Sequence, residues 1–181
     1  MMKPRFATLT AVVLLAAAWR LIPHPWNLTP ITAMALFAGS HFSNRRTAYL
    51  LPIAAILISN LILGEFYSTL PFVLAGFALT VFIGTRLRER RDALSIGAGA
   101  LASSLLFFAI TNFGHWAVSM DYPKNAGGLA ACFTAAIPFF RNELFGDLAF
   151  TGIFFGGFAL LERRFPALRE SPSAPLRLLP R

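Results

Sequence analysis

The stretch of sequence that decides the fold is NLTPITAMALFAGSHFSNRR, residues 27–46. Its apolar part, from Pro30 to Phe42, contains no Asp, Glu, Lys or Arg and is only 13 residues long. A helix that crosses a membrane alone needs about 20 apolar residues, with about 17 as the lower limit. We therefore expect this segment to be tucked inside a helical bundle, or to be continued by non-helical backbone that lines a cavity.

The composition of the whole chain agrees with a membrane protein. The 181 residues are 56% hydrophobic and 13% charged, and the mean hydropathy is +0.63. An ordinary soluble domain is about 45–50% apolar and about 25% charged. These values exclude a disordered chain and argue against a soluble globule, because too little polar surface is left to cover one. A single cysteine, Cys132, excludes an internal disulfide.

Five further apolar segments have the composition of membrane helices. The first of them begins after Lys3 and Arg5 and resembles a signal peptide, but bulky Trp19 follows Ala18 where cleavage would occur, and further spans come later. We therefore predict a membrane helix there. The five segments are Phe6–Leu21, Ala48–Leu63, Leu70–Leu87, Leu94–Trp116 and Leu144–Leu161.

Basic residues orient these segments. If all six cross the membrane, 13 of the 16 Lys and Arg residues lie on one side, which the positive-inside rule assigns to the cytoplasm together with both termini. A seventh apolar run, residues 127–140, would move an arginine cluster outside if it crossed as well. The sequence thus predicts an all-α integral membrane protein with six transmembrane helices plus a short re-entrant or interfacial helix before the last span. Residues 1–164 form a single domain in this prediction, and residues 165–181 a disordered basic cytoplasmic tail.

Polar residues gather at the predicted outer ends of the helices. Because polar groups inside a membrane are costly, their convergence predicts a shallow polar pocket open to the outside. Alternative roles stay open: an aromatic belt for the Trp and Tyr residues, interhelical hydrogen bonds for the Asn residues, and an ion pair between Arg141 and Asp147. The candidate substrate-binding residues are Asn60, Asn112, His115, Trp116, Tyr122, Arg141, Asn142 and Asp147.

Motifs for metals and nucleotides are missing from the sequence. The three His residues have no HExxH spacing, and no Walker A loop, GxGxxG or GxSxG motif occurs. We therefore predict no metal, no cofactor and no nucleotide site in this chain, so any use of ATP must come from a partner. The formal net charge of +8 is explained by membrane orientation, and no nucleic-acid partner is predicted.

Three motifs carry a resemblance: NLTPITAMALFAG at residues 27–39, TNFGHW at 111–116 and FFRNELFGDL at 139–148. With the segments around them, from Arg20 to Phe155, they resemble an uncharacterised family of bacterial membrane proteins assigned to transport. That family is similar to the substrate-binding S components of energy-coupling factor vitamin transporters. The resemblance implies a six-helix bundle in the bacterial inner membrane that binds a small molecule at its outer face and is energised by a scaffold subunit and two ATPases.

The leading functional hypothesis is capture of a small organic molecule for uptake, without enzyme activity. The resemblance further implies that Ala7 and Ala11, at small-xxx-small spacing on the first helix, dock the scaffold subunit. Two alternatives stay open. One is a membrane-embedded enzyme that uses Asp147 and His115 as an acid–base pair, and the other is a structural membrane subunit without a ligand.

Overall fold

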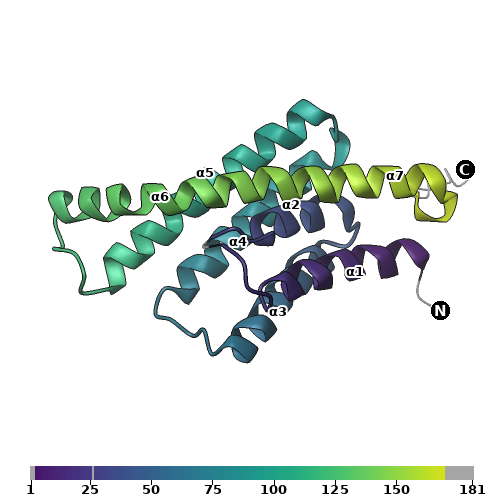
Figure 1. Cartoon of the computed structure of the whole chain (residues 1–181). Coiled ribbons are helices and arrows are strands. Elements are labelled where there is room, and N and C mark those ends of the chain that lie inside the picture. The colour runs from purple at the N-terminus through teal and green to yellow at the C-terminus, as the bar shows by residue number, and fades with distance from the viewer. Residues whose placement is uncertain (1–2, 26, 170–181) are drawn as a thin grey trace, which may run out of the picture.

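The computed structural model describes residues 3–25 and 27–169, and within these ranges it contains helices and no strand (Figure 1). The last two α-helices, α6 and α7, are joined without a break by a π-helix at Gly152–Gly156, so they form one rod from Ala126 to Arg164. The fold is therefore all-α with six helices. The α-helices are α1 (Pro4–Trp19), α2 (Ile31–His41), α3 (Arg45–Leu63), α4 (Leu70–Arg86), α5 (Ala93–Val118), α6 (Ala126–Thr151) and α7 (Gly157–Arg164).

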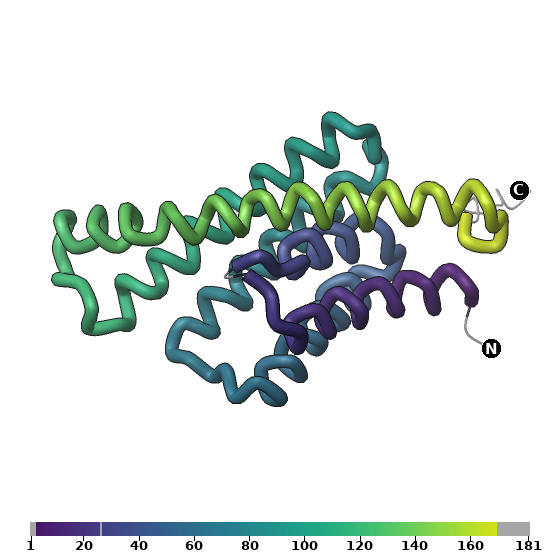
Figure 2. Tube along the Cα trace, viewed as in Figure 1, coloured from purple at the N-terminus to yellow at the C-terminus, as the bar shows by residue number. Residues whose placement is uncertain are grey.

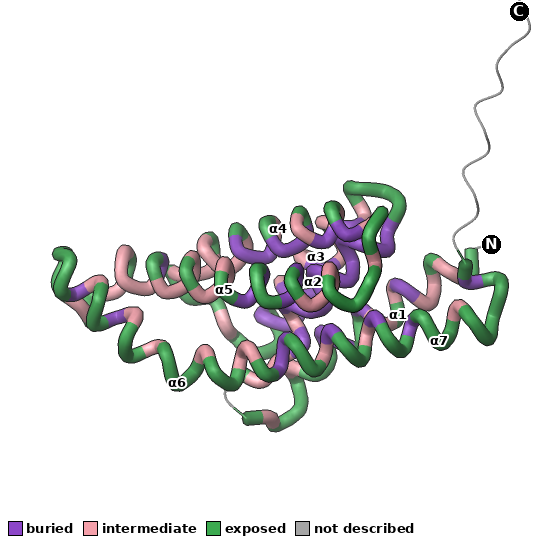
Figure 3. The backbone as a smooth tube through the Cα atoms, turned by 90° about the horizontal axis from the view of Figure 1, so that it is seen from above, coloured by how far each residue is buried: buried purple, intermediate pink, exposed green. Residues whose placement is uncertain are grey.

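The short helix α2 is the centre of the bundle, as its length predicts. Every residue from Thr32 to Phe42 is buried, and Figure 3 shows this burial concentrated in α2 and in the parts of its neighbours that face it. A helix that is apolar on all sides is stable only when it is surrounded. The non-helical backbone before α2 contains Asn27 with a positive φ of 58°, and it lines a cavity. Both expectations for this segment are thus confirmed.

Two glycines bring α2 and α4 into backbone contact. A Cβ atom added to Gly84 would lie 2.3 Å from the carbonyl oxygen of Leu36, and one added to Gly39 would lie 2.3 Å from that of Val81. No side chain larger than hydrogen fits at either position without moving a helix. Small residues at a crossing let membrane helices approach closely, and this crossing fixes α2 against α4.

The helices run back and forth, so that both ends of the described chain lie on the same side of the bundle (Figures 1 and 2). This side, here called the arginine end, is held together by its basic side chains. Arg88 donates hydrogen bonds to the carbonyl oxygens of Gly39 and Phe42, the last of which lies 2.6 Å away, and thereby satisfies the end of α2. Arg5 makes an ion pair with Glu162 and so ties α1 to α7.

Four helices are long and apolar enough to cross a membrane, which suggests a multi-pass membrane protein. They are α3, α4 with the 3₁₀ turn that follows it, α5, and the α6–α7 rod. Helices α1 and α2 are apolar but shorter, with 16 and 11 residues. The lengths and apolar character of these helices agree with the predicted helical membrane protein.

The expectation of a separate re-entrant or interfacial helix at residues 127–140 is wrong. Those residues are the first half of the continuous rod, which has 39 residues and is about 58 Å long at 1.5 Å per residue. Charged Arg141 and Glu143 interrupt the hydropathy but not the helix, because both are good helix formers. Pro138 lies within α6 and removes one backbone N–H without ending it. Figure 1 shows that this half of α6 pairs with α5 in a hairpin that projects beyond the other helices.

The expectation of a disordered tail from residue 165 is wrong for its first residues. Pro166–Leu168 form a 3₁₀ turn, and Leu168 is buried because it packs back onto the bundle. Arg5 donates a hydrogen bond to the carbonyl oxygen of Leu168 at 2.6 Å. Residues 170–181 lie outside the described residues.

Candidate functional site

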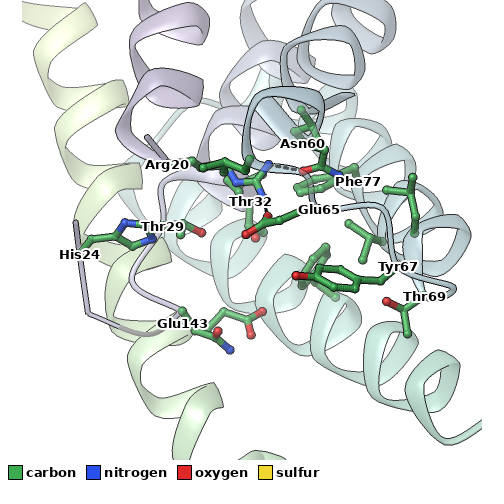
Figure 4. Close-up of a pocket in the computed structure, with 17 residues that line it drawn as sticks. Arg20, His24, Thr29, Thr32, Asn60, Glu65, Tyr67, Thr69, Phe77 and Glu143 are labelled. Carbon is green, nitrogen blue, oxygen red and sulfur yellow. Dashed lines mark hydrogen bonds and ion pairs between the residues drawn. The ribbon is translucent and has the colours of Figure 1, made fainter. Parts of the chain in front are cut away.

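The end opposite the arginine end contains two adjoining cavities, the larger of which is drawn in Figure 4. The larger has a volume of about 540 Å³ and lies between the loop before α2, the start of α2, the end of α3 and the start of α4. The smaller, of about 440 Å³, continues between α4, α5 and α6. The residues that line both cavities are Asn27, Thr69, Val73, Phe107 and Glu143.

Arg20 organises one wall of the larger cavity. Its Nη1 donates to Ser59 Oγ at 2.6 Å and to Asn60 Oδ1 at 2.5 Å, and its Nη2 pairs with Glu65 Oε2 at 2.5 Å. Figure 4 shows Arg20 reaching Asn60 and Glu65. Burial lowers the pKa of Arg20 from its usual value, and the charge of Glu65 raises it in part. The guanidinium stays protonated and is already committed to three acceptors.

Glu143 enters the cavities from α6. Its side chain is half-buried, and its Oε1 atom is buried without a hydrogen-bond partner among the described residues. Figure 4 shows the carboxylate extending from the helix into the open space that Tyr67 and Thr69 border from the other side. A buried carboxylate oxygen without a partner is unfavourable, and the open cavity beside Glu143 leaves room for a ligand that could supply a donor.

Apolar and aromatic side chains form the remaining walls. Phe77 and Phe107 lie side by side with ring centroids 5.1 Å apart, and Val73 and Leu70 continue the surface on α4. A few polar groups on a largely apolar concave surface are typical of a site for a small molecule, which the apolar walls desolvate and the polar groups orient.

Asp147 lies one helical turn from Glu143, behind the cavities. It is 1% exposed, and its Oδ2 accepts a hydrogen bond from Ser104 Oγ on α5 at 2.7 Å. Thr32 on α2 lies close to the same carboxylate. Asp147 therefore faces protein rather than lipid and joins α6 to α2 and α5. It does not pair with Arg141, which is exposed.

Of the eight candidate substrate-binding residues, the structure places three on the cavities. Asn60 lines the larger cavity, and Asn112 and His115 line the smaller one. The other five do not line either cavity: Trp116, Tyr122, Arg141, Asn142 and Asp147. Arg141 and Asn142 lie on the exposed side of α6.

Trp116 and Tyr122 stabilise the loop at the tip of the α5–α6 hairpin instead. Trp116 Nε1 donates to the carbonyl oxygen of Pro123 at 2.9 Å, and Lys124 lies over the indole ring. Tyr122 contacts His115 edge to face, and His115 Nε2 lies 3.1 Å from Asp121 Oδ2. The structure does not bring His115 near Asp147. Ser104, the partner of Asp147, is 11 residues from His115 on α5, or about 16 Å along the helix.

The Lys, Arg, Asp and Glu residues that line the cavities are not among the sequence-derived substrate-binding candidates: they are Arg20, Glu65 and Glu143. Glu143 had a signal, because it lies four residues before Asp147 and so shares its helix face. Arg20 and Glu65 lie 45 residues apart in loops, and nothing in the sequence indicates that they pair.

The candidate docking residues lie on the outward side of α1. Ala11 is exposed and Ala7 is partly exposed, whereas Leu9 and Val13 face the bundle. Among the described residues, no group of three or more His, Cys, Asp or Glu side chains is arranged to hold a metal ion.

Residues 1–168 match a family of unknown function (DUF6580), and the chain belongs to that family. No curated protein and no solved structure matches the chain.

Proposed function

We propose that this protein captures a small organic molecule in the paired cavities and presents it for uptake across the membrane. The observation that carries the proposal is the larger cavity, whose volume of about 540 Å³ falls within the range of about 300–1,000 Å³ usual for small-molecule sites. Its lining combines fixed hydrogen-bonding groups with an aromatic surface. This combination supports recognition of one compound better than passage of a solvated ion.

The direction of capture follows from charge. The described basic clusters lie at the arginine end, and such clusters stay on the cytoplasmic side of a bacterial inner membrane. The cavities are at the other end and would therefore face outward, with both termini in the cytoplasm. A site in this position meets its ligand before the ligand enters the cell.

Uptake against a gradient needs an energy source that this chain does not encode by any nucleotide-binding motif. We propose that separate scaffold and ATPase subunits supply it, as in the S components that the sequence resembles. The outward side of α1, with Ala11 exposed, supports a docking role for this helix, because small residues let a partner helix approach.

The proposal is tested by filling the cavity. Thr69 lines both cavities and its side chain caps no helix, so Thr69→Trp should block the space with little effect on folding. Ser68→Trp is the matched control, because Ser68 is the exposed neighbour and lines neither cavity. Small molecules extracted from the three purified proteins are then quantified by mass spectrometry.

We expect one compound to copurify with the wild type and with Ser68→Trp, and to fall at least about tenfold in Thr69→Trp. Equal amounts of the compound in all three proteins would show that it does not bind in the cavities. A compound that is converted to a product during incubation would favour an enzyme, and a protein that retains no compound in any form would favour a structural subunit.

A further inference from the structure

The residues that line the cavities include one basic side chain, Arg20, and two acidic ones, Glu65 and Glu143, so their formal charges do not balance. Arg20 and Glu65 neutralise each other across the larger cavity. Glu143 then adds a carboxyl group for which the described lining offers no second Lys or Arg, and its Oε1 has no partner among the described residues. Burying such a group in a membrane protein costs several kcal/mol unless a counter-charge or a donor reaches it.

Groups that face Glu143 from the other elements do not supply this counter-charge. The residues that share both cavities with it are uncharged and come from the loop before α2, from α4 and from α5. The two histidines of the lining have other contacts: His24 Nδ1 lies 2.7 Å from the carbonyl oxygen of Ile22, and His115 lies beside Asp121.

Nearby cations are committed elsewhere. Arg20 is held by three acceptors, and Lys124 binds the carbonyl oxygens of Trp116 and Ser119 in the hairpin loop. Arg141 is exposed on the opposite side of α6. Asp147 lies one turn further along the same helix face, and as an acidic residue it cannot supply a counter-charge to Glu143.

On these grounds we infer that the ligand is an organic cation whose protonated nitrogen binds Glu143 while its apolar part lies against Phe107 and Val73. This inference rests on the proposed function, because it names the substrate class of the same cavities. A carboxylate paired with an ammonium group makes a charge-assisted hydrogen bond, which is about twice as strong as a neutral one. An anionic ligand of the same shape would meet unpaired negative charge and would be rejected.

The charge class is tested with three probes that share one skeleton: 2-phenylethylamine, which is cationic at pH 7, neutral 2-phenylethanol, and anionic phenylacetate. Each is titrated into the full-length protein in nanodiscs of zwitterionic lipid, and heats from empty nanodiscs are subtracted. We expect the wild type to bind the amine at least about tenfold more tightly than either of the other two probes.

Glu143→Gln removes the charge but keeps the shape, and should bring the affinity for the amine to within about threefold of that for the alcohol. Glu89→Gln is the matched control, because Glu89 lies exposed at the arginine end, far from the cavities, and should leave the preference intact. Thr69→Lys is a second test of the same charge effect. It places a cation on the wall opposite Glu143 and should also abolish the preference for the amine over the other two probes.

Failure of the inference and failure of the proposed function give different results. Tighter binding of phenylacetate or the alcohol, lost in Thr69→Trp, would overturn the inference and leave small-molecule capture standing. An amine preference that survives Glu143→Gln would overturn the role of Glu143. Binding of none of the probes, together with no copurified compound, would overturn both.

Discussion

The crossing of α2 and α4 gives the sharpest test of the architecture. Gly84→Ala adds one methyl group whose carbon would lie 2.3 Å from the carbonyl oxygen of Leu36 and 3.0 Å from the Cα of Gly39. Ordinary contacts begin at about 3.4 Å, so the two helices must separate by about 1 Å. The obstructing atoms are backbone, and no side chain can rotate away to make room.

The size of the effect follows from that rigidity. Overpacking usually costs about 1–3 kcal/mol, and a clash with backbone belongs at the upper end. At about 2–4 °C per kcal/mol for a chain of this length, Gly84→Ala should lower the Tm by about 6–12 °C. Gly97→Ala in α5 is the control, because nothing lies within 4 Å of the added carbon. It should raise stability by about 0.5–1 kcal/mol, since alanine loses less backbone freedom in a helix.

Thermal unfolding in nanodiscs, followed by circular dichroism at one scan rate, measures both variants. Gly39→Ala makes the same clash from the other helix, so the double variant should lose less stability than the sum of the two single variants. If Gly84→Ala unfolds within about 1 °C of the wild type, or moves in the same direction as Gly97→Ala, the close approach of the two helices is wrong.

Three further predictions concern the site, the docking face and the orientation. Asn112→Ala should weaken ligand binding about tenfold in titrations, because Asn112 lines the smaller cavity. Asp147→Ala should instead lower the free energy of unfolding by about 1–3 kcal/mol and leave the copurified ligand in place, since Asp147 is buried against Ser104. The opposite pattern in titrations and melting curves would reverse these two roles. Ala7→Leu combined with Ala11→Leu should abolish uptake by cells but leave ligand binding unchanged, and loss of folding would show that the face packs internally. Reporter fusions should read in, out, in, out, in, and an external signal at the last position would contradict six crossings; the fusion points are after Phe42, Leu63, Leu87, Met120 and Arg164.

Much of the fold could be predicted from the sequence because hydropathy and length act locally. The segment from Pro30 to Phe42 is too short to cross a bilayer alone, and burial at the centre of the bundle is one of the two solutions that this length allows. The other solution is a continuation by non-helical backbone that lines a cavity, and the loop that contains Asn27 is such a segment. The structure shows both: the helix is buried at the centre of the bundle, and the loop before it lines the cavity.

The site was less predictable because its walls are assembled from loops that are distant in the sequence. Asn60 was a candidate from its place near the end of α3, and the structure adds the partner that holds it, Arg20, from the end of α1. The pairing of Arg20 with Glu65 depends on how α1 packs on α3. Local patterns carry no information about such a contact, since each residue alone is only a charge in a polar loop.

The continuity of the last helix decides which acidic and basic residues reach the cavities. Successive residues of a helix are rotated by about 100°, so Arg141 lies about 200° from Glu143, whereas Asp147 lies within about 40° of it. Once residues 126–151 are one helix, turning Asp147 toward Ser104 also turns Glu143 inward and Arg141 outward. A break between residues 140 and 144 removes this constraint and leaves Arg141 free to pair with Asp147. The continuity of this helix therefore decides which of its polar residues face the cavities, and the same rotation leaves Glu143 facing them without a cation of its own.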